Sequence, residues 1–405
     1  MQGGSSAHFD CCRIPRTLNS IHFIESADKG SMSSLRIALV HDWLTGMRGG
    51  EKVLEVLCEL YPQATLFTLL HNKGNASETI ERMKIHTSFI DRLPFKAAKY
   101  RNYLPLFPRA IESFDFSEFD LILSTSHAVA KGARPAPGAL HICYCHTPMR
   151  YVWELYDEYF GPGRAGLVTR AAMSIVAPRL REWDVRSSDR VNFFVANSRN
   201  VAGRIRQYYR KPAEVIHPPV NIDQFVVSEK DEGYYLIVSA LVPYKRVDLA
   251  IDAFNQIGER LVIVGTGPES KKLQSMANKN IEFLGWQNDL ELSKLYAGCR
   301  ALIFPGIEDF GIVPLEAMAS GKPVIAFAKG GALETVVEGT RFPTGLFFRE
   351  QSVQALKDAI AKFSTSKFDP LTIRTHAERF ARPQFKERIQ LYVDEKLAMH
   401  GKKVH

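Results

Sequence analysis

The sequence lacks a long hydrophobic run, since no stretch reaches the roughly 18 consecutive apolar residues that a membrane-spanning helix needs. Residues 1–31 also lack the continuous apolar core of a signal peptide and show no periodicity. We therefore predict no spanning helix, and we interpret residues 1–34 as a disordered N-terminal extension. Met32, just before the first predicted strand, is a candidate start of the folded protein.

Cysteine is scarce, and metal-binding patterns are missing. Six of the 405 residues are cysteine, and none of them has the spacing of zinc ligands. No Asp-x-Asp pair follows a predicted strand in the C-terminal half. These absences favour reduced thiols in a cytoplasmic protein, and they are consistent with a site that uses no metal or other cofactor.

Charge of one sign is in modest excess. Lysine and arginine number 52 against 44 acidic residues, which gives a net charge of +8. This excess is compatible with anionic substrates or an anionic membrane surface, and it does not indicate a nucleic-acid partner. The length and the 45% of hydrophobic residues suit two domains of ordinary size, each with its own core.

Strand-like apolar segments alternate with helical periods along the chain, which predicts an α/β fold with parallel sheets covered by helices. We assign residues 35–216 and 233–380 to two doubly wound domains, joined by an extended linker at residues 217–232. Open parallel sheets bind ligands beyond the carboxyl ends of their strands, so two facing domains form a cleft for two substrates. The predicted strands are residues 35–40, 120–124, 140–144 and 191–195 in the first domain, and 234–238, 261–264, 281–284, 301–304 and 323–327 in the second.

The most informative segment runs from residue 308 to 319. Residues 301–304 ahead of it read as a short buried strand, and Pro314 suits the first turn of a helix. A helix start exposes unpaired backbone N–H groups and a partial positive charge, so Gly311 and its neighbours suit an anionic group. The carboxylates of Glu308 and Glu316 are acceptors for hydroxyl groups. The segment predicts a sugar-nucleotide site, although each glutamate alone is also compatible with an ordinary loop or helix-start acid.

The two glutamates, together with Phe310, Gly311 and Ile312 between them, resemble the Glu-x7-Glu signature of family 4 glycosyltransferases. The resemblance extends from residue 35 to about residue 397. It implies the GT-B fold, in which two Rossmann-like domains face a central cleft, the first for the acceptor and the second for the donor nucleotide. It also implies that a C-terminal helix within residues 381–405 packs back on the first domain. Glu316 would bind the ribose hydroxyls and Glu308 those of the transferred sugar.

Other segments of the second domain resemble donor-binding segments of the family. Lys245 matches a lysine that neutralises the leaving diphosphate, whereas Ala240 stands where an arginine is common. Arg246 is a candidate for the missing guanidinium, and Trp286 lies where the base is often recognised. Glycines at two strand ends permit backbone to approach a diphosphate, although tight turns explain them equally well: Gly265, Gly267, Gly330 and Gly331.

The first domain offers candidates for the acceptor side and the reacting centre. Gly49 and Gly50 precede the helical period at residues 53–60 and suit a close approach to ligand oxygens, or an ordinary strand-to-helix turn. His127 and His146 end predicted strands on the cleft side, where either would orient the acceptor or stabilise charge at the anomeric carbon. We favour His146 slightly, because its neighbours are more family-like. Structural histidines are the alternative.

The resemblance further implies a retaining transfer without a metal, in which the departing diphosphate receives the acceptor's proton. It also implies lipid-linked acceptors, and so favours peripheral contact with an anionic membrane. The segment 84–109 interleaves cations and aromatic residues in a way that suits this contact, although a solvated basic face over a core is equally compatible. Its cations are Lys84, Arg92, Lys96, Lys99, Arg101 and Arg109.

We therefore predict a glycosyltransferase that moves a hexose from a nucleotide-diphosphate sugar to a lipid-linked saccharide or polysaccharide, on the cytoplasmic side. Segments 242–248 and 146–153 look like those of bacterial mannosyltransferases of surface-polysaccharide assembly, which favours GDP-mannose. The alternatives are a UDP-sugar epimerase or a phosphorylase on the same fold, and a catalytically degenerate sugar-nucleotide scaffold, which Ala240 favours. A nicotinamide-dependent oxidoreductase is disfavoured, because no Gly-x-Gly-x-x-Gly turn follows the first strand.

Overall fold

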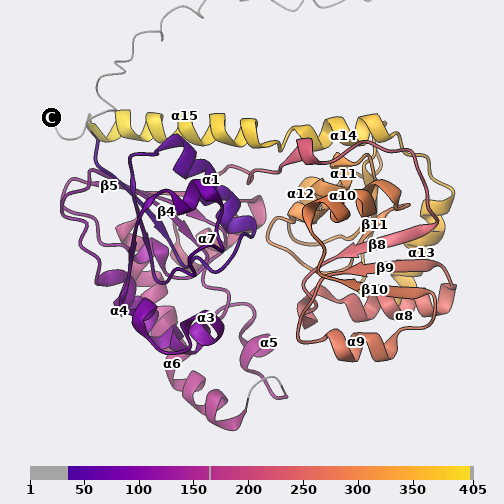
Figure 1. The fold of residues 1–405 in the computed structure, drawn as a ribbon, viewed down its shortest axis with the longest axis horizontal. Helices are drawn as coiled ribbons and strands as arrows, with labels where there is room; N and C mark the ends of the chain where they lie inside the picture. Colours follow the sequence, from indigo (N-terminus) through magenta and orange to yellow (C-terminus); the bar gives the residue numbers. More distant parts are fainter. Residues whose placement is uncertain (1–34, 164–165, 402–405) are drawn as a thin grey trace, which may run out of the picture. The chain divides into compact units, whose positions relative to one another are not determined.

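The predicted apolar segments form strands of two parallel sheets in the computed structural model, which describes residues 35–163 and 166–401 (Figure 1). The first sheet belongs to the first lobe, residues 36–215. Its central strand β1 is buried along its whole length, which explains its uninterrupted apolar sequence. In spatial order the strands are β3 (Lys84–Thr87), β2 (Thr65–Thr68), β1 (Ile37–His41), β4 (Leu121–Ser126), β5 (Leu140–Cys145), β6 (Phe193–Ala196) and β7 (Ala213–Val215).

The second sheet belongs to the second lobe, residues 234–378. It is also parallel throughout. Its strands, in spatial order, are β10 (Ile281–Gly285), β9 (Arg260–Val264), β8 (Tyr234–Val238), β11 (Leu302–Phe304), β12 (Val324–Phe327) and β13 (Gly345–Phe348). Residues 216–233 connect the two sheets, close to the linker that the sequence predicts.

Each sheet is doubly wound, and its strand order reverses between two central neighbours. These neighbours are β1 and β4 in the first sheet and β8 and β11 in the second. The loops that leave the carboxyl ends of such neighbouring strands diverge to opposite faces of the sheet, and the crevice between them is where ligands bind in open α/β sheets. The predicted α/β class and two-domain plan are confirmed.

Amphipathic helices cover both sheets. Helix α1 shows the cause, because Val53, Leu54 and Leu57 recur at helical spacing and are buried against the first sheet. None of the helices in the described ranges is both long and apolar enough to cross a bilayer. The first lobe contains α1 (Gly49–Leu60), α2 (Glu78–Glu81), α3 (Lys96–Lys99), α4 (Phe107–Glu112), α5 (Tyr156–Phe160), α6 (Leu167–Ser187) and α7 (Arg199–Tyr209). The second contains α8 (Val247–Ile257), α9 (Ser270–Met276), α10 (Asp289–Gly298), α11 (Ile312–Ala319), α12 (Ala332–Thr335), α13 (Val353–Ser364) and α14 (Pro370–Glu378).

The last helix, α15 (Arg382–Gly401), leaves the second lobe and runs along the first (Figure 1). Arg382 pairs with Glu55 and Glu59 of α1 at 3.0 and 2.7 Å. The ring of Phe385 packs on that of Tyr144 in β5, with centroids 5.7 Å apart. The expected return of the C-terminal helix to the first domain is confirmed.

Four short strands were not predicted: β2, β3, β7 and β13. Three of them lie at sheet edges, where one side of the strand pairs with nothing, and β3 exposes most of its side chains. Short edge strands need little apolar sequence, so their pattern is weak. The predicted extension at residues 1–34 and the last residues, 402–405, lie outside the described residues.

Candidate active site

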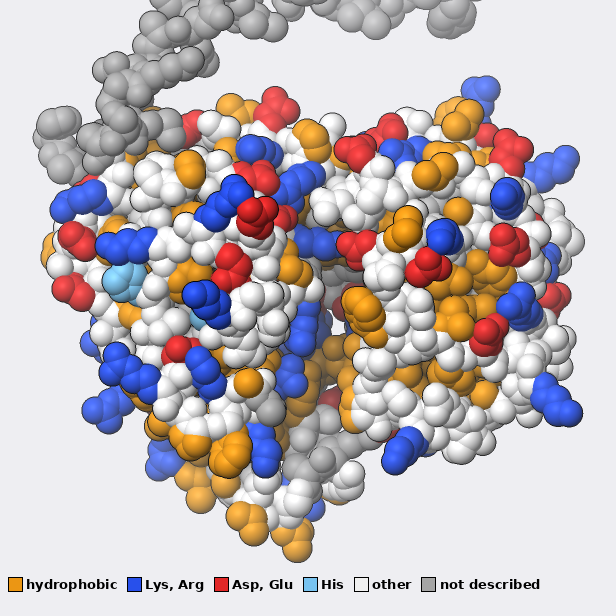
Figure 2. Space-filling view, in the orientation of Figure 1, with side chains coloured by type: hydrophobic (Ala, Val, Ile, Leu, Met, Phe, Trp, Pro, Cys, Tyr) orange, Lys and Arg blue, Asp and Glu red, His pale blue; other side chains and the backbone are white. Residues whose placement is uncertain are grey.

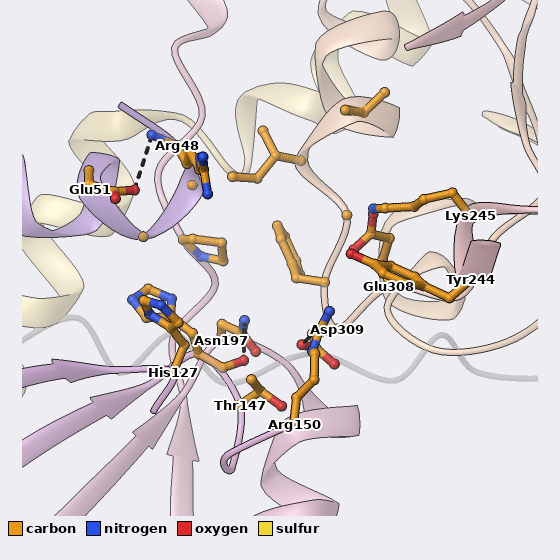
Figure 3. A pocket seen from close by; sticks show the side chains of 18 of the residues that line it. Arg48, Glu51, His127, Thr147, Arg150, Asn197, Tyr244, Lys245, Glu308 and Asp309 are labelled. Atoms are coloured by element: carbon orange, nitrogen blue, oxygen red, sulfur yellow. Dashed lines mark hydrogen bonds and ion pairs between the residues drawn. The ribbon is translucent and has the colours of Figure 1, made fainter. Parts of the chain in front are cut away.

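A cavity of about 470 Å³ opens where the reversal points of the two sheets face each other. Figure 2 shows the surface hollowed between the lobes, and Figure 3 shows the side chains that line the hollow. The first lobe contributes residues that follow β1, β3, β4, β5 and β6, and the second lobe those after β8 and β11. The polar and charged lining residues are Arg48, Glu51, Arg101, His127, His146, Thr147, Arg150, Tyr151, Tyr159, Asn197, Tyr244, Lys245, Glu308 and Asp309.

On the first-lobe wall, His127 is held by the fully buried carboxylate of Asp42. Asp42 Oδ2 lies 3.1 Å from His127 Nδ1, and it also accepts the backbone N–H groups of His127 and Ala128 at 2.6 and 3.0 Å. Oδ1 accepts those of Val129 and Ala130 at 2.6 and 2.7 Å. With Nδ1 directed at the carboxylate, Nε2 of the ring is the nitrogen left to accept a hydrogen bond at the cavity.

These contacts shift both ionisation equilibria. Burial raises the pKa of Asp42, but His127, His41 and the backbone N–H donors outweigh burial and bring it below its usual value. Burial lowers the pKa of His127, and Asp42 opposes this effect without cancelling it. His127 is therefore mainly a neutral acceptor at neutral pH, oriented by a carboxylate that stays ionised.

A second carboxylate supports the same wall from α1. Glu51 Oε2 accepts the backbone N–H of Arg48 at 3.1 Å, and Oε1 lies 3.8 Å from His41 Nε2. His41 Nδ1 in turn is 2.6 Å from Thr125 Oγ1. Burial raises the pKa of Glu51, but His41, the nearby His127 and a backbone N–H together outweigh burial, so the pKa is lowered. The start of α1 is thereby tied to β1 and β4.

His146 also lines the cavity, beside the start of α1. Burial lowers its pKa to about 3, so the imidazole is neutral at any physiological pH. A Cβ at Gly50 would lie 3.5 Å from His146 Nε2, and one at Gly49 would lie 3.1 Å from Ile312 Cδ1 of the second lobe. The two glycines therefore allow the start of α1 to approach both His146 and α11.

The second-lobe wall is built by the loop between β11 and α11. Glu308 contacts Lys245, and Asp309 contacts two arginines of the first lobe, Arg150 and Arg204. Figure 3 shows Arg150 reaching from the first lobe to Asp309, with Glu308 and Lys245 to the right of them. Burial and the nearby Arg150 lower the pKa of Lys245 to about 7, whereas the contact with Glu308 favours the charged form.

The structure brings many of the predicted site residues to this one cavity. The lining includes Gly49, Gly50, His127, His146, Lys245, Glu308, Phe310, Gly311 and Ile312. Gly311, with φ of 88°, is the residue at which the loop turns into α11. The predicted residues come from both lobes and from segments far apart in the chain.

Glu316 lies behind the cavity wall, near the middle of α11, and is largely buried. Its Oε2 accepts the hydroxyl of Tyr296 at 3.0 Å, and its Oε1 is 3.5 Å from Lys52 Nζ of α1. The carboxylate is therefore held between the two lobes, next to the residues that line the cavity.

The predicted glycines lie beneath the cavity loops. Gly331 donates its N–H to the carbonyl of Glu308 at 2.9 Å, and a Cβ at Gly330 would lie 2.4 Å from that same oxygen. A Cβ at Gly265 or Gly267 would meet the carbonyl oxygen of Ser239 or Leu241, at 1.9 and 2.3 Å. In the structure these glycines allow backbone segments of the second lobe to pack closely.

Two further predicted residues point elsewhere. Arg246 has a left-handed backbone, with φ of 51°, and its guanidinium bonds Asp248 at 3.1 Å and Gln351 at 3.3 Å. Trp286 is 74% exposed on the second lobe and is not among the lining residues.

Sequence reasoning gave no role to several residues of the wall. Asp42 and Glu51 carry a usable signal, because Asp42 directly follows the first strand and Glu51 follows the glycine pair. Arg150 and Asp309 lie inside family-like segments, but their contact joins two lobes and cannot be predicted from a local sequence pattern. Arg204 lies in the middle of α7, where a cation is ordinarily a solvated side chain.

Comparisons with known proteins agree with this geometry. The model described as Glycosyltransferase Family 4 matches residues 48–224, and the model described as Glycosyl transferases group 1 matches residues 221–382. The two matches divide the chain as the lobes do, and both include lining residues of the cavity.

Relatives and solved structures extend the similarity. The chain is 26% identical over 385 residues to alpha-1,3/1,6-mannosyltransferase alg2 of Schizosaccharomyces pombe, which covers 79% of this chain and 72% of that protein. It is 29% identical over 168 residues to O-antigen chain mannosyltransferase RfbU of Salmonella typhimurium, covering 37% and 46%. The chain spans about half the length of several relatives that it matches.

A crystal structure of Anabaena Alr3699/HepE, in complex with UDP and glucose, superposes with a TM-score of 0.65 at 18% identity. The match covers 89% of this chain and 99% of that one, and it shows the shared two-domain fold. The matched models, the named glycosyltransferase relatives and the paired sheets agree, and the chain belongs to the family 4 glycosyltransferases, with the GT-B fold.

Proposed function

We propose that this glycosyltransferase is a retaining hexosyltransferase that transfers mannose from GDP-mannose to a lipid-linked saccharide or polysaccharide. The main support for the proposal is that Glu308 and Lys245 of the second lobe and His127 of the first line the same cavity. This cavity lies where the strand order of each sheet reverses. The mannosyltransferase names of the yeast and Salmonella relatives support the choice of sugar.

The residues would divide the work by chemistry. Glu308 would accept hydrogen bonds from the hydroxyls of the transferred sugar, and Glu316 from the ribose. Lys245 would stabilise the negative charge that develops on the diphosphate as the anomeric C–O bond breaks. His127, oriented by Asp42, and the neutral His146 would accept hydrogen bonds from hydroxyls near the anomeric carbon.

The proposed step balances without a metal or other cofactor. The acceptor oxygen forms a bond to the anomeric carbon on the face from which the diphosphate departs, and the hydroxyl proton passes to an oxygen of that diphosphate. The configuration at the anomeric carbon is then retained. The protein's contribution is to hold the two substrates together and to stabilise the charge that separates.

The test begins with thermal-shift assays of the protein with GDP, UDP, ADP and their sugars, since a ligand of the folded state raises the melting temperature. We expect GDP and GDP-mannose to give the largest shifts. The preferred sugar nucleotide, incubated with a membrane extract, should then yield a glycosylated lipid or polysaccharide with an axial linkage by NMR. Binding of the donor without transfer or donor hydrolysis would instead support the scaffold alternative, which Ala240 favours.

We also propose that the first lobe contacts an anionic membrane through segment 84–109. Ile90, Tyr100, Leu104 and Phe107 belong to the core, whereas Phe95 is 72% exposed, with Lys99 Nζ 5.5 Å from its ring centroid. A cation beside an exposed aromatic ring suits a lipid headgroup layer.

Phe95→Asn tests this contact, because asparagine tolerates the left-handed backbone found there, with φ of 57°. We expect less co-sedimentation with vesicles that contain phosphatidylglycerol. Val226→Asn, at an apolar residue that is 69% exposed elsewhere, is the matched control and should bind like the unaltered protein. Equal losses in both variants, or no vesicle binding at all, would contradict the contact.

A further inference from the structure

A second cation of the cavity lies close to Lys245 but comes from the opposite lobe. Arg150 Cζ is 5.9 Å from the centroid of the Tyr244 ring, and Lys245 Nζ is 5.3 Å from the same centroid. Both side chains line the cavity. Arg150 follows β5 in the first lobe, and its guanidinium crosses to Asp309 in the loop between β11 and α11 of the second lobe (Figure 3).

The contact with Asp309 fixes Arg150 in this position. It is made through Arg150 Nη2, while the other oxygen of Asp309 contacts Arg204. A guanidinium has five N–H donors in a planar fork, so one contact leaves most of them available. Asp309 can therefore hold Arg150 at the cavity wall and leave other donors of the guanidinium for a ligand.

Lys245 and Arg150 each have one carboxylate partner, Glu308 and Asp309, and both side chains still line the cavity. Burial is the main cause of the lowered pKa of Lys245, and the positive charge of Arg150 lowers it further. Phosphate oxygens match the guanidinium fork, and a diphosphate offers charge to both cations at once. Neither residue 240 nor residue 246 of the second lobe supplies a free guanidinium for a diphosphate, because residue 240 is alanine and the Arg246 guanidinium bonds Asp248 and Gln351.

We propose that Arg150 binds the diphosphate of the sugar-nucleotide donor from across the cavity, with Asp309 as its positioning residue. The inference rests on the proposed function and adds a residue to it. The first lobe then contributes to donor binding, and the charge on the leaving group is shared between Lys245 and Arg150.

The experiment compares binding of GDP and of guanosine, by calorimetry, in the unaltered protein, Arg150→Gln and Arg150→Lys. UDP and uridine replace them if UDP gives the larger thermal shift. A charge-assisted contact predicts that Arg150→Gln weakens diphosphate binding about ten- to a hundred-fold and leaves nucleoside binding within about twofold. The GDP affinity of Arg150→Lys should lie between that of the unaltered protein and that of Arg150→Gln, because lysine keeps the charge but lacks the planar set of donors.

Arg204→Gln is the matched control. Arg204 contacts the same carboxylate, and also Glu154 at 2.5 Å, but it does not line the cavity. Its loss should change GDP affinity by about twofold at most. An equal loss in both variants would overturn the proposal, because it would indicate that the pair acts by holding the lobes together.

Other outcomes also separate the possibilities. Unchanged GDP binding in Arg150→Gln, with a raised KM for the acceptor, would assign the residue to an acceptor phosphate and overturn the proposal. If the unaltered protein binds neither GDP nor UDP, that result contradicts the proposed function itself and not only the role of Arg150. Thermal unfolding of each variant shows whether it is folded, and Arg150→Lys keeps the test decisive if Arg150→Gln is not.

Discussion

Two aspartates, one in each lobe, show how differently the cavity walls are built. Asp42 and Asp309 both stand in loops after central strands, and they are 0% and 7% exposed. Asp42 accepts four backbone N–H groups of its own lobe, whereas Asp309 is held by two guanidinium groups of the other.

The side chains of the first wall are held by contacts within one lobe, whereas Asp309 of the second wall is held by contacts between the two lobes. The loop after β4 wraps around Asp42, so His127 is positioned by contacts within the first lobe alone. Asp309 and Arg150 meet only when the lobes do. We infer that the first wall is fixed by contacts within its own lobe, whereas the contact between Arg150 and Asp309 depends on the approach of the two lobes.

The largest expected effect is on transfer, at the second wall. Glu308→Ala should reduce turnover at least about a thousandfold, which corresponds to about 4 kcal/mol, because the carboxylate would bind hydroxyls of the sugar undergoing transfer. The melting temperature should change little, because Glu308 makes its side-chain contact with Lys245 at the open cavity. Turnover of radiolabelled donor, measured beside a thermal melt, checks both statements. Normal turnover by the folded variant would remove Glu308 from the proposed mechanism.

The next effect is on stability, and it compares the two aspartates directly. Asp42→Ala leaves four buried N–H groups without an acceptor, each of which costs about 1 to 3 kcal/mol, so unfolding should become easier by at least about 3 kcal/mol. Asp309→Ala should cost less, about 2 kcal/mol, because it removes charge-assisted contacts of two largely buried arginines, of which Arg204 keeps Glu154 as a partner. Urea unfolding of the two variants measures both losses in the free energy of unfolding. A larger loss in Asp309→Ala than in Asp42→Ala would contradict the proposed difference between the walls.

Sequence patterns predicted the parts of this site that are local. The strand ends, the glycine pair at 49–50 and the Glu308 loop all appear in short segments whose spacing reflects a turn or a helix start. His127 and His146 were found because they end strands, and in parallel sheets all such ends lie at one edge.

The remaining parts depend on which side chains meet across the lobes. Arg246 was a reasonable candidate for a phosphate contact by its position, but a left-handed backbone and Asp248 direct it away from the cavity. Arg150, about a hundred residues earlier in the chain, lies there instead. The sequence shows that a cation is missing at residue 240, and only the tertiary structure shows which other cation is near.

The smallest expected effect is a pH dependence that belongs to the second wall alone. Binding an anion favours the ammonium form of Lys245, whose pKa is about 7, so raising the pH removes the charge and weakens binding. Between pH 7 and 8.5, where the diphosphate itself is already ionised, GDP affinity should fall about tenfold. His146, with a pKa of about 3, stays neutral throughout, so the first wall should contribute no change. Lys245→Met, which keeps the length of the side chain without its charge, should bind GDP more weakly and with a flat pH profile. Calorimetry at several pH values measures the GDP affinity of both proteins. If the affinity of Lys245→Met falls as steeply with pH as that of the unaltered protein, the titrating group is not Lys245, and the pH dependence cannot be attributed to the second wall.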